Sequence, residues 1–181
     1  MKSTQQGIGL VEVLVALLLL AVAVLGFSSM QMTAVKATDE SVIRSRALTV
    51  MRGGAEMMRA NPEGITAFET ALNDGSYSGV TADSCKDANS SCTIEQLAAR
   101  DALSLRVFAD SNDVRIEMGD CVGTSAGQTI KCLTASWGET APVYNDSTNA
   151  ITFRGVADLK PCAKTTGEYH PGAQCFIMEA Y

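Results

Sequence analysis

An uninterrupted apolar run near the N-terminus limits what this chain can fold into. The twenty residues from Ile8 to Phe27 contain a single ionisable side chain, that of Glu12. At about 1.5 Å of rise per residue, a helix of this length spans the roughly 30 Å hydrocarbon core of a bilayer. We therefore expect residues 8–28 to form a transmembrane helix, with residues 1–7 as a short polar leader.

Glu12 is the residue that a simple membrane anchor does not explain. A carboxylate costs about 2.5–3.5 kcal/mol at the centre of a bilayer and less toward the interface. Cleavage after Gly7 would give Ile8 a new α-amino group, so that a cation and an anion would lie one helical turn apart. An ordinary secretory signal fits less well, because its apolar run is about 7–15 residues long and small residues follow it. A plain signal anchor is the alternative.

The stretch GIGLVEVLVALLLL, from Gly7 to Leu20, resembles the N-terminus of type IV pilins and pseudopilins. In that family the leader ends in Gly and the mature apolar run carries a glutamate at its fifth position. The resemblance implies that a prepilin peptidase cuts between Gly7 and Ile8, that the Ile8 amine is methylated, and that Glu12 directs assembly into a filament. Ser29 stands where major pilins usually have Pro, and this departure indicates a minor pilin.

A helical pattern continues beyond the apolar run. Asn61 and Pro62 end it, because proline restrains the residue before it and cannot continue the hydrogen-bond ladder. We expect one helix over about 8–60, whose amphipathic second half lies within residues 29–61. The pair Gly53 and Gly54 marks either a bend or a close approach of another backbone. The apolar positions recur at intervals of three and four residues: Val35, Val42, Ile43, Ala47, Val50, Met51, Ala55 and Met58.

Residues 62–181 are expected to form a globular α+β domain. A short helix is predicted over 65–72, and a capping box from Thr93 to Gln96 predicts an additional helix over about 93–110. Four later segments alternate as strands do, which predicts a four-stranded antiparallel sheet packed against the second half of the long helix. These segments are residues 114–121, 128–138, 150–159 and 174–181.

Six cysteines suit three disulfide bonds and an oxidising compartment. No two of them have the C-x-x-C spacing of a zinc or redox site. Several pairings are possible, but each consecutive pair brackets a loop or turn, which favours bonds between neighbours. These pairs are Cys85 with Cys92, Cys121 with Cys132, and Cys162 with Cys175. The resemblance implies that the last pair is the counterpart of the C-terminal disulfide loop of type IV pilins.

Charge and motif content argue against several classes of function. The chain has 14 basic and 20 acidic residues without a basic run, which disfavours nucleic acid as a partner. Its single histidine, His170, is expected in an exposed loop, and its single tryptophan, Trp137, in the sheet core. Phosphate-binding loops and nucleophile elbows are missing from the sequence, so we expect no enzyme, no catalytic residue, no metal site and no cofactor.

Two further stretches resemble PilV-like minor pilins, known as type IV pilus modification proteins. One runs from Arg44 to Gly64, and the other is a short Cys loop leading into a helix, residues 85–102. The resemblance implies a structural subunit that primes pilus assembly in a tip complex. Before assembly it would be held in the bacterial inner membrane, with its globular domain in the periplasm, and it would then join a cell-surface pilus that serves twitching motility and cell adhesion.

The same resemblance names the expected partners and the alternatives. The expected partners are the prepilin peptidase, the membrane through residues 8–28, other minor pilins, the major pilin and a tip adhesin. A minor pseudopilin of a type II secretion system is one alternative, since it shares the leader, the glutamate and the long helix. An adhesive binding module at the pilus tip is the other.

Overall fold

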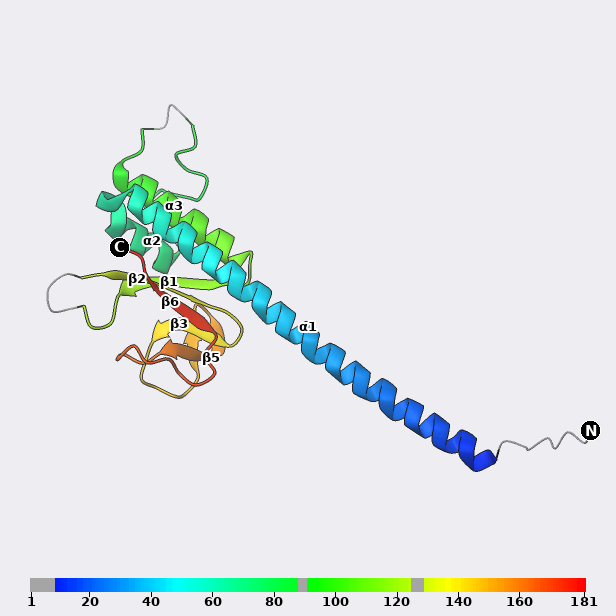
Figure 1. Cartoon of the computed structure of the whole chain (residues 1–181). Coiled ribbons are helices and arrows are strands. Elements are labelled where there is room, and N and C mark those ends of the chain that lie inside the picture. Colours follow the sequence, from blue (N-terminus) through cyan, green and yellow to red (C-terminus); the bar gives the residue numbers. More distant parts are fainter. Residues whose placement is uncertain (1–8, 88–90, 125–128) are drawn as a thin grey trace, which may run out of the picture. The chain divides into compact units, whose positions relative to one another are not determined.

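The structure is a computed structural model that describes residues 9–87, 91–124 and 129–181. The chain divides into two compact units, the first ending at Val42 and the second running from Ile43 to Tyr181. One helix, α1 (Leu10–Ala60), contributes to both units (Figure 1). All other helices and strands belong to the second unit.

The ends of α1 follow from local chemistry. At its start, the backbone N–H groups of Glu12 and Val13 donate to the carbonyl oxygen of Gly9, at 2.9 and 3.4 Å. At its end, Pro62 opens the 3-10 turn η1 (Pro62–Gly64), because proline has no N–H with which to continue the helix. The predicted helix end near Ala60 is confirmed.

The C-terminal part of α1 packs into the core of the globular unit. Its buried residues follow the intervals of three and four that the sequence shows: Ala47, Val50, Met51, Gly54, Ala55 and Met58. A Cβ atom on Gly54 would lie 2.8 Å from Leu105 Cδ2 and 2.9 Å from Leu133 Cδ1. Of the two readings of the glycine pair, Gly54 therefore serves a close approach, here of side chains from α3 and the sheet.

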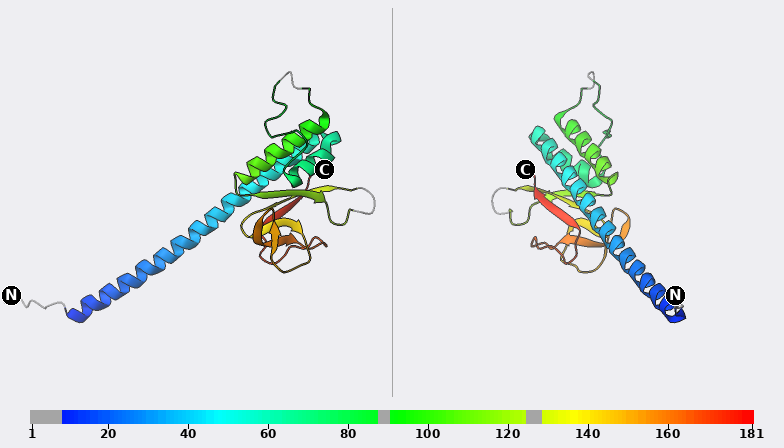
Figure 2. Two further views of the ribbon diagram at one scale, coloured as in Figure 1. Left: turned by 180° about the vertical axis from the view of Figure 1, so that it is seen from behind. Right: turned by 45° about the vertical axis from the view of Figure 1, so that its right-hand side comes forward.

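Two further helices lie beside this part of α1 (Figure 2). Helix α2 (Ile65–Asp74) extends two residues beyond its predicted end and stops at Gly75, which has a left-handed φ of 73°. Helix α3 (Ile94–Asp110) begins at the predicted capping box. The Thr93 N–H donates to Gln96 Oε1 at 2.9 Å, and the Gln96 N–H donates to Thr93 Oγ1 at 3.3 Å.

The strands form two small sheets, so the prediction of one four-stranded antiparallel sheet is wrong. The first sheet has the order β1-β2-β6 and is antiparallel throughout. The second has the order β3-β5-β4, in which β3 pairs with β5 in parallel and β4 pairs with β5 antiparallel. The strands are β1 (Arg115–Asp120), β2 (Lys131–Ser136), β3 (Thr140–Tyr144), β4 (Ile151–Phe153), β5 (Val156–Ala163) and β6 (Cys175–Glu179).

Two local features explain the difference. β3 reads TAPVY, and its proline and short length hide it from an alternation test. The segment predicted as one strand over 150–159 is instead split by a tight turn, in which Arg154 and Gly155 have left-handed φ values of 48° and 82°. The α+β class and the packing of an apolar sheet face on α1 are as expected, since Ile116 and Leu133 lie in the same core cluster as Met51.

The predicted burial of Trp137 is confirmed, whereas the predicted exposure of His170 is wrong. Trp137 is buried as predicted, and its ring lies 5.2 Å from that of Phe176, centroid to centroid. His170 is buried as well, so its assignment to an exposed loop is wrong. Its backbone N–H donates to the carbonyl oxygen of Cys162 at 3.1 Å, and its Nε2 lies 2.8 Å from the carbonyl oxygen of Asn145. These bonds fix the ring against the second sheet.

Candidate functional site

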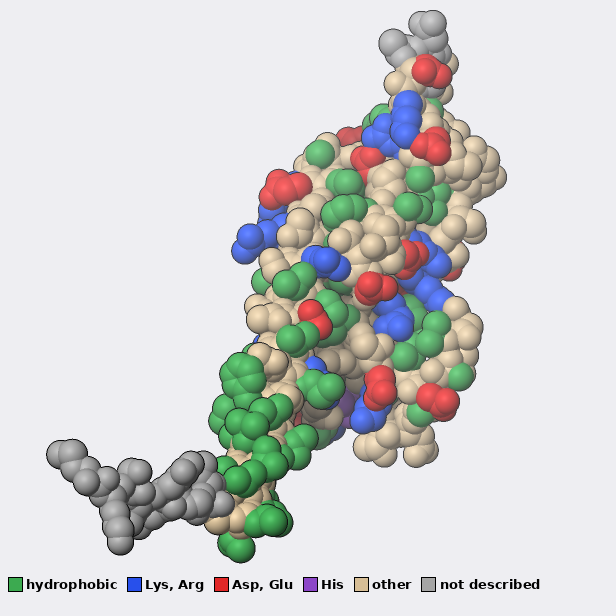
Figure 3. Space-filling model, turned by 90° about the vertical axis from the view of Figure 1, so that its right-hand side faces the viewer, with side chains coloured by type: hydrophobic (Ala, Val, Ile, Leu, Met, Phe, Trp, Pro, Cys, Tyr) green, Lys and Arg blue, Asp and Glu red, His purple; other side chains and the backbone are tan. Residues whose placement is uncertain are grey.

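The N-terminal part of α1 presents an apolar surface that the chain itself does not cover. From Leu10 to Phe27 the large hydrophobic side chains are 49–83% exposed. By length and composition this helix can cross a membrane, and none of its most apolar stretch is buried. Figure 3 shows these hydrophobic side chains gathered along the helix. Because so large an apolar surface is unfavourable in water, it must be covered by lipid or by other protein chains.

Glu12 lies in the first turn of this helix. Its carboxylate is exposed and forms no ion pair with any residue that the structure describes. The positive end of the helix dipole stabilises a negative charge at this position by about 0.3–1 kcal/mol. That stabilisation is smaller than the cost of a carboxylate deep in lipid, so the charge calls for a cationic partner that the described residues do not supply.

The predicted cleavage and methylation sites, Gly7 and Ile8, lie outside the described residues. The described chain begins at Gly9, one residue after the predicted mature N-terminus. A helix start at Leu10 leaves Ile8 close to the first turn in sequence, as pairing of its amine with Glu12 requires. The pairing itself remains a prediction.

Three disulfide bonds join the cysteines in sequence order. Cys85 bonds to Cys92, Cys121 to Cys132, and Cys162 to Cys175, and no cysteine is free. The second bond closes the hairpin of β1 and β2, and the third links β5 of one sheet to β6 of the other. All three belong to the globular unit.

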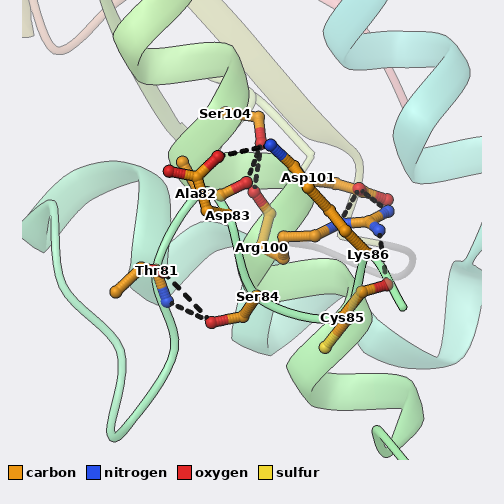
Figure 4. Close-up of polar contacts among 9 residues, drawn as sticks. All are labelled: Thr81, Ala82, Asp83, Ser84, Cys85, Lys86, Arg100, Asp101 and Ser104. Carbon is orange, nitrogen blue, oxygen red and sulfur yellow. Dashed lines mark hydrogen bonds and ion pairs between the residues drawn. The ribbon is translucent and has the colours of Figure 1, made fainter. Parts of the chain in front are cut away.

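The loop between α2 and α3 is fastened to α3 by polar contacts (Figure 4). Arg100 Nη1 donates to the carbonyl oxygen of Cys85 at 3.4 Å, and Ser104 Oγ donates to that of Ala82 at 3.3 Å. Both donors are on α3, one helical turn apart. The loop that carries the Cys85–Cys92 bond is therefore held by α3 as well as by its own turn, in which the Thr81 N–H donates to Ser84 Oγ at 2.9 Å.

The described residues hold no group of three or more His, Cys, Asp or Glu side chains that could bind a metal ion. One partly buried acidic group is Glu117, whose Oε2 has no hydrogen-bond partner among the described residues and whose carboxyl pKa is raised by burial. It lies on β1.

Comparison with known protein families gives two adjoining matches. Residues 2–28 match the family described as the prokaryotic N-terminal methylation motif. Residues 29–103 match the family described as type IV pilin Tt1218. No curated protein and no solved structure matches the chain.

The methylation motif, together with an exposed apolar helix that carries Glu12, defines a prepilin-type subunit that is processed by prepilin peptidase and anchored in a membrane. The adjoining match of residues 29–103 to a pilin family narrows this class of protein further. The chain belongs to the type IV pilin-like family. That family consists of structural subunits that assemble with other pilins into a pilus. The match ends at residue 103, before the first strand.

One feature of the globular unit was missed by the sequence reading. Arg106, Arg115 and Arg154 are scattered along the chain but lie around one cavity in the structure. The only sequence signal was the Arg154-Gly155 dipeptide inside an apparent strand, since glycine there favours a turn. Nothing in the sequence placed Arg106 beside that turn.

Proposed function

We propose that the protein is a minor type IV pilin, of the PilV-like kind, that helps prime pilus assembly as part of a tip complex. Before assembly it is held in the inner membrane by residues 8–28, with residues 62–181 in the periplasm. The observation that carries the proposal is Glu12, a carboxylate in the first turn of an uncovered apolar helix, for which the described residues supply no ion-pair partner. Such a helix is suited to leaving lipid for a filament in which an Ile8 amine, of the same or a neighbouring subunit, supplies the partner.

The minor role rests on narrower observations. Ser29 replaces the proline that is usual in major pilins, and residues 44–64 and 85–102 resemble PilV-like minor pilins. The globular unit that would be carried at the tip is cross-linked by three disulfides. Partners in this role are other minor pilins, the major pilin and a tip adhesin.

The first test is the N-terminus of the mature protein. Cleavage after Gly7 leaves 174 residues that begin at Ile8, with a side-chain charge of −7, because the leader removes Lys2 and no acidic residue. Gly7→Leu should leave the chain uncut in the membrane, whereas Gly9→Ala, where a Cβ meets nothing within 4 Å, should be cut normally. An intact Met1, or cleavage beyond Phe27, in the mass spectrum of the wild-type protein would overturn the proposal.

The second test separates membrane insertion from assembly. Glu12→Gln removes the charge and keeps the shape of the side chain, so insertion and cleavage should continue while incorporation into pili fails. Asp39→Asn, on the same helix beyond the apolar run, is the matched control and should be incorporated. Normal incorporation of Glu12→Gln would show that the charge does not direct assembly.

The third test concerns priming and the two alternatives. Deleting the protein should lower pilus number far more than its share of the filament mass, since nucleation limits assembly. Electron microscopy in a retraction-deficient strain separates assembly from withdrawal. Normal pilus numbers with lost secretion of folded periplasmic proteins would instead assign a pseudopilin of type II secretion. Normal pili with lost attachment would assign an adhesive module.

A further inference from the structure

Three arginines from three different elements of the globular unit line one cavity. Arg106 lies on α3, Arg115 lies on β1, and Arg154 lies in the turn between β4 and β5. The cavity, called here the arginine pocket, has a volume of about 230 Å³, and its other lining residues are Asp110, Phe153 and Val156. Segments far apart in the sequence thus bring three positive charges to one hollow.

Backbone carbonyls, which are neutral, hold two of the guanidinium groups. Arg106 Nη1 donates to the carbonyl oxygens of Leu72 and Asn73 at 3.0 and 3.1 Å. Arg154 Nη2 donates to the same two oxygens, also at 3.0 and 3.1 Å. These oxygens end α2, where the helix dipole is negative. Two like charges therefore meet at one helix end.

The third guanidinium is held in the same way. Arg115 Nη1 donates to the carbonyl oxygens of Gly138 and Thr140, at 2.9 and 3.3 Å. In each of the three arginines only one nitrogen takes part in these bonds, while a guanidinium carries further N–H donors. The arginine pocket therefore has fixed guanidinium groups with hydrogen-bonding capacity to spare.

The three charges have no close counter-ion. In the part of the chain that the structure describes, no carboxylate lies within ion-pair distance of these guanidinium groups. Glu117, Asp110 and Asp74 attract Arg154 at longer range only. Burial and then the adjacent Arg106 lower the pKa of the Arg154 guanidinium, so an anion in contact with this group would stabilise its charged form.

We propose that the arginine pocket binds the carboxylate group of a small acidic ligand. A planar carboxylate accepts paired N–H bonds from a guanidinium fork, which makes it a matched ligand for Arg115 and Arg154. Asp110 also lines the pocket and weakens its attraction for every anion. The match between a planar carboxylate and the guanidinium fork, rather than the charge of the ligand, favours a carboxylate over phosphate. The proposal does not depend on the role of the chain in a pilus.

Calorimetric titration of the purified full-length mature chain, in a non-ionic detergent at low salt, tests the pocket directly. Sodium glucuronate and sodium acetate are the probes, glucose is the neutral control, and inorganic phosphate is the competing oxyanion. Saturable binding of a carboxylate, absent with glucose and weakened by added sodium chloride, supports the proposal. Equal binding of acetate and glucuronate would mean that the carboxylate alone is recognised, as on an acidic side chain of another subunit. Tighter binding of glucuronate would point to a free sugar acid.

Variants with opposite expected signs make the test specific. Arg115→Gln should weaken glucuronate binding about tenfold, because it removes a charged donor. Asp110→Asn should tighten binding about fivefold, because it removes a repelling charge and breaks no side-chain bond among the described residues. Arg59→Gln, at an exposed pair with Glu56, should change nothing.

Trp137 fluorescence reports whether each variant is folded. The Asp110→Asn result stands even if Arg115→Gln fails to fold, since a gain of affinity cannot arise from unfolding. No saturable carboxylate binding, glucose binding equal to that of glucuronate, tighter binding of phosphate, or an Asp110→Asn variant without tighter binding would each overturn the proposal.

Discussion

The two parts of α1 have the same backbone conformation and opposite relations to solvent. Up to Val42, no described residue of the helix is buried, although most of them are apolar. From Ile43 onward, one face of the helix is buried in the core of the globular unit and the other face is polar or exposed. A helix thus forms in both parts, but the chain supplies the packing partner for only one of them.

Charge and cross-links show the same contrast. Between Glu12 and Lys36 the sequence has no ionisable residue and no cysteine. The globular unit holds all three disulfides and a partly buried ion-pair group, in which Lys131 Nζ lies 2.8 Å from Glu69 and 2.6 Å from Asp120. The stability of the globular unit is therefore internal, while that of the first part depends on lipid or on other subunits.

The largest expected effect comes from removing equal side chains from the two parts. Met51 is fully buried, whereas Met30 is 76% exposed. Met51→Ala should lower the free energy of unfolding of the globular unit by about 2–5 kcal/mol. Met30→Ala should change it by less than about 0.5 kcal/mol. Denaturant titration of the full chain in detergent, monitored by the fluorescence of Trp137, measures the free energy of unfolding of both variants. Equal losses in the two variants would show that the two parts of α1 do not differ in packing.

A charge placed in the apolar run should weaken membrane insertion of the first part of α1 and leave the stability of the globular unit unchanged. Leu18→Arg should disfavour membrane insertion by about 2.5–3.5 kcal/mol, the cost of an arginine near the bilayer centre. Val35→Arg, beyond residues 8–28, is the matched control and should insert normally. Resistance to alkaline extraction measures insertion. The unfolding transition of the globular unit should stay unchanged in both variants.

Removing a disulfide should lower the stability of the globular unit and leave the apolar segment unaffected. Replacing both Cys85 and Cys92 by Ser should lower the stability of the globular unit by about 2.5 kcal/mol, as loop-closure entropy gives for a short loop. Membrane insertion and cleavage should not change. Denaturant titration gives the first result and the mature mass gives the second. A loss of insertion in this variant would show that the two parts depend on each other.

The sequence made some elements predictable and left others hidden, for physical reasons. The end of α1, the capping box at Thr93 and the three neighbouring disulfides depend on local chemistry, which a sequence displays directly. The second sheet depends on a parallel pairing of β3 with β5, whose partners are distant in sequence and whose strands lack alternation. Periodicity cannot detect such a pairing.

The two candidate sites differ in the same way, since one was recognisable from local sequence and the other was not. Glu12 was found because a charge in an apolar run is conspicuous without any structure. The arginine pocket was not found, because its three arginines come together only through the packing of α3, β1 and the Arg154 turn. Local signals therefore identified Glu12 as a candidate, whereas a site built from tertiary contacts required the fold.

The smallest expected effect concerns two threonines, one in the globular unit and one in the exposed part of α1. Thr93 caps α3, and its Oγ1 accepts the N–H of Gln96. Thr33 lies in the exposed part of α1, where its Oγ1 donates to the carbonyl oxygen of Ser29 at 3.1 Å, within an already bonded helix. Thr93→Ala should lower the stability of the globular unit by about 1 kcal/mol, because an N–H at the helix start loses its acceptor.

Thr33→Ala should leave that stability within about 0.5 kcal/mol of the wild type, because it leaves no backbone group without a partner and alanine favours a helix. Thr93→Ser, which keeps the hydroxyl, should restore most of the loss and so separates capping from packing of the methyl group. If Thr93→Ser were as destabilising as Thr93→Ala, the capping bond would not be what fixes the start of α3, and the Cys85–Cys92 loop would have to set it instead.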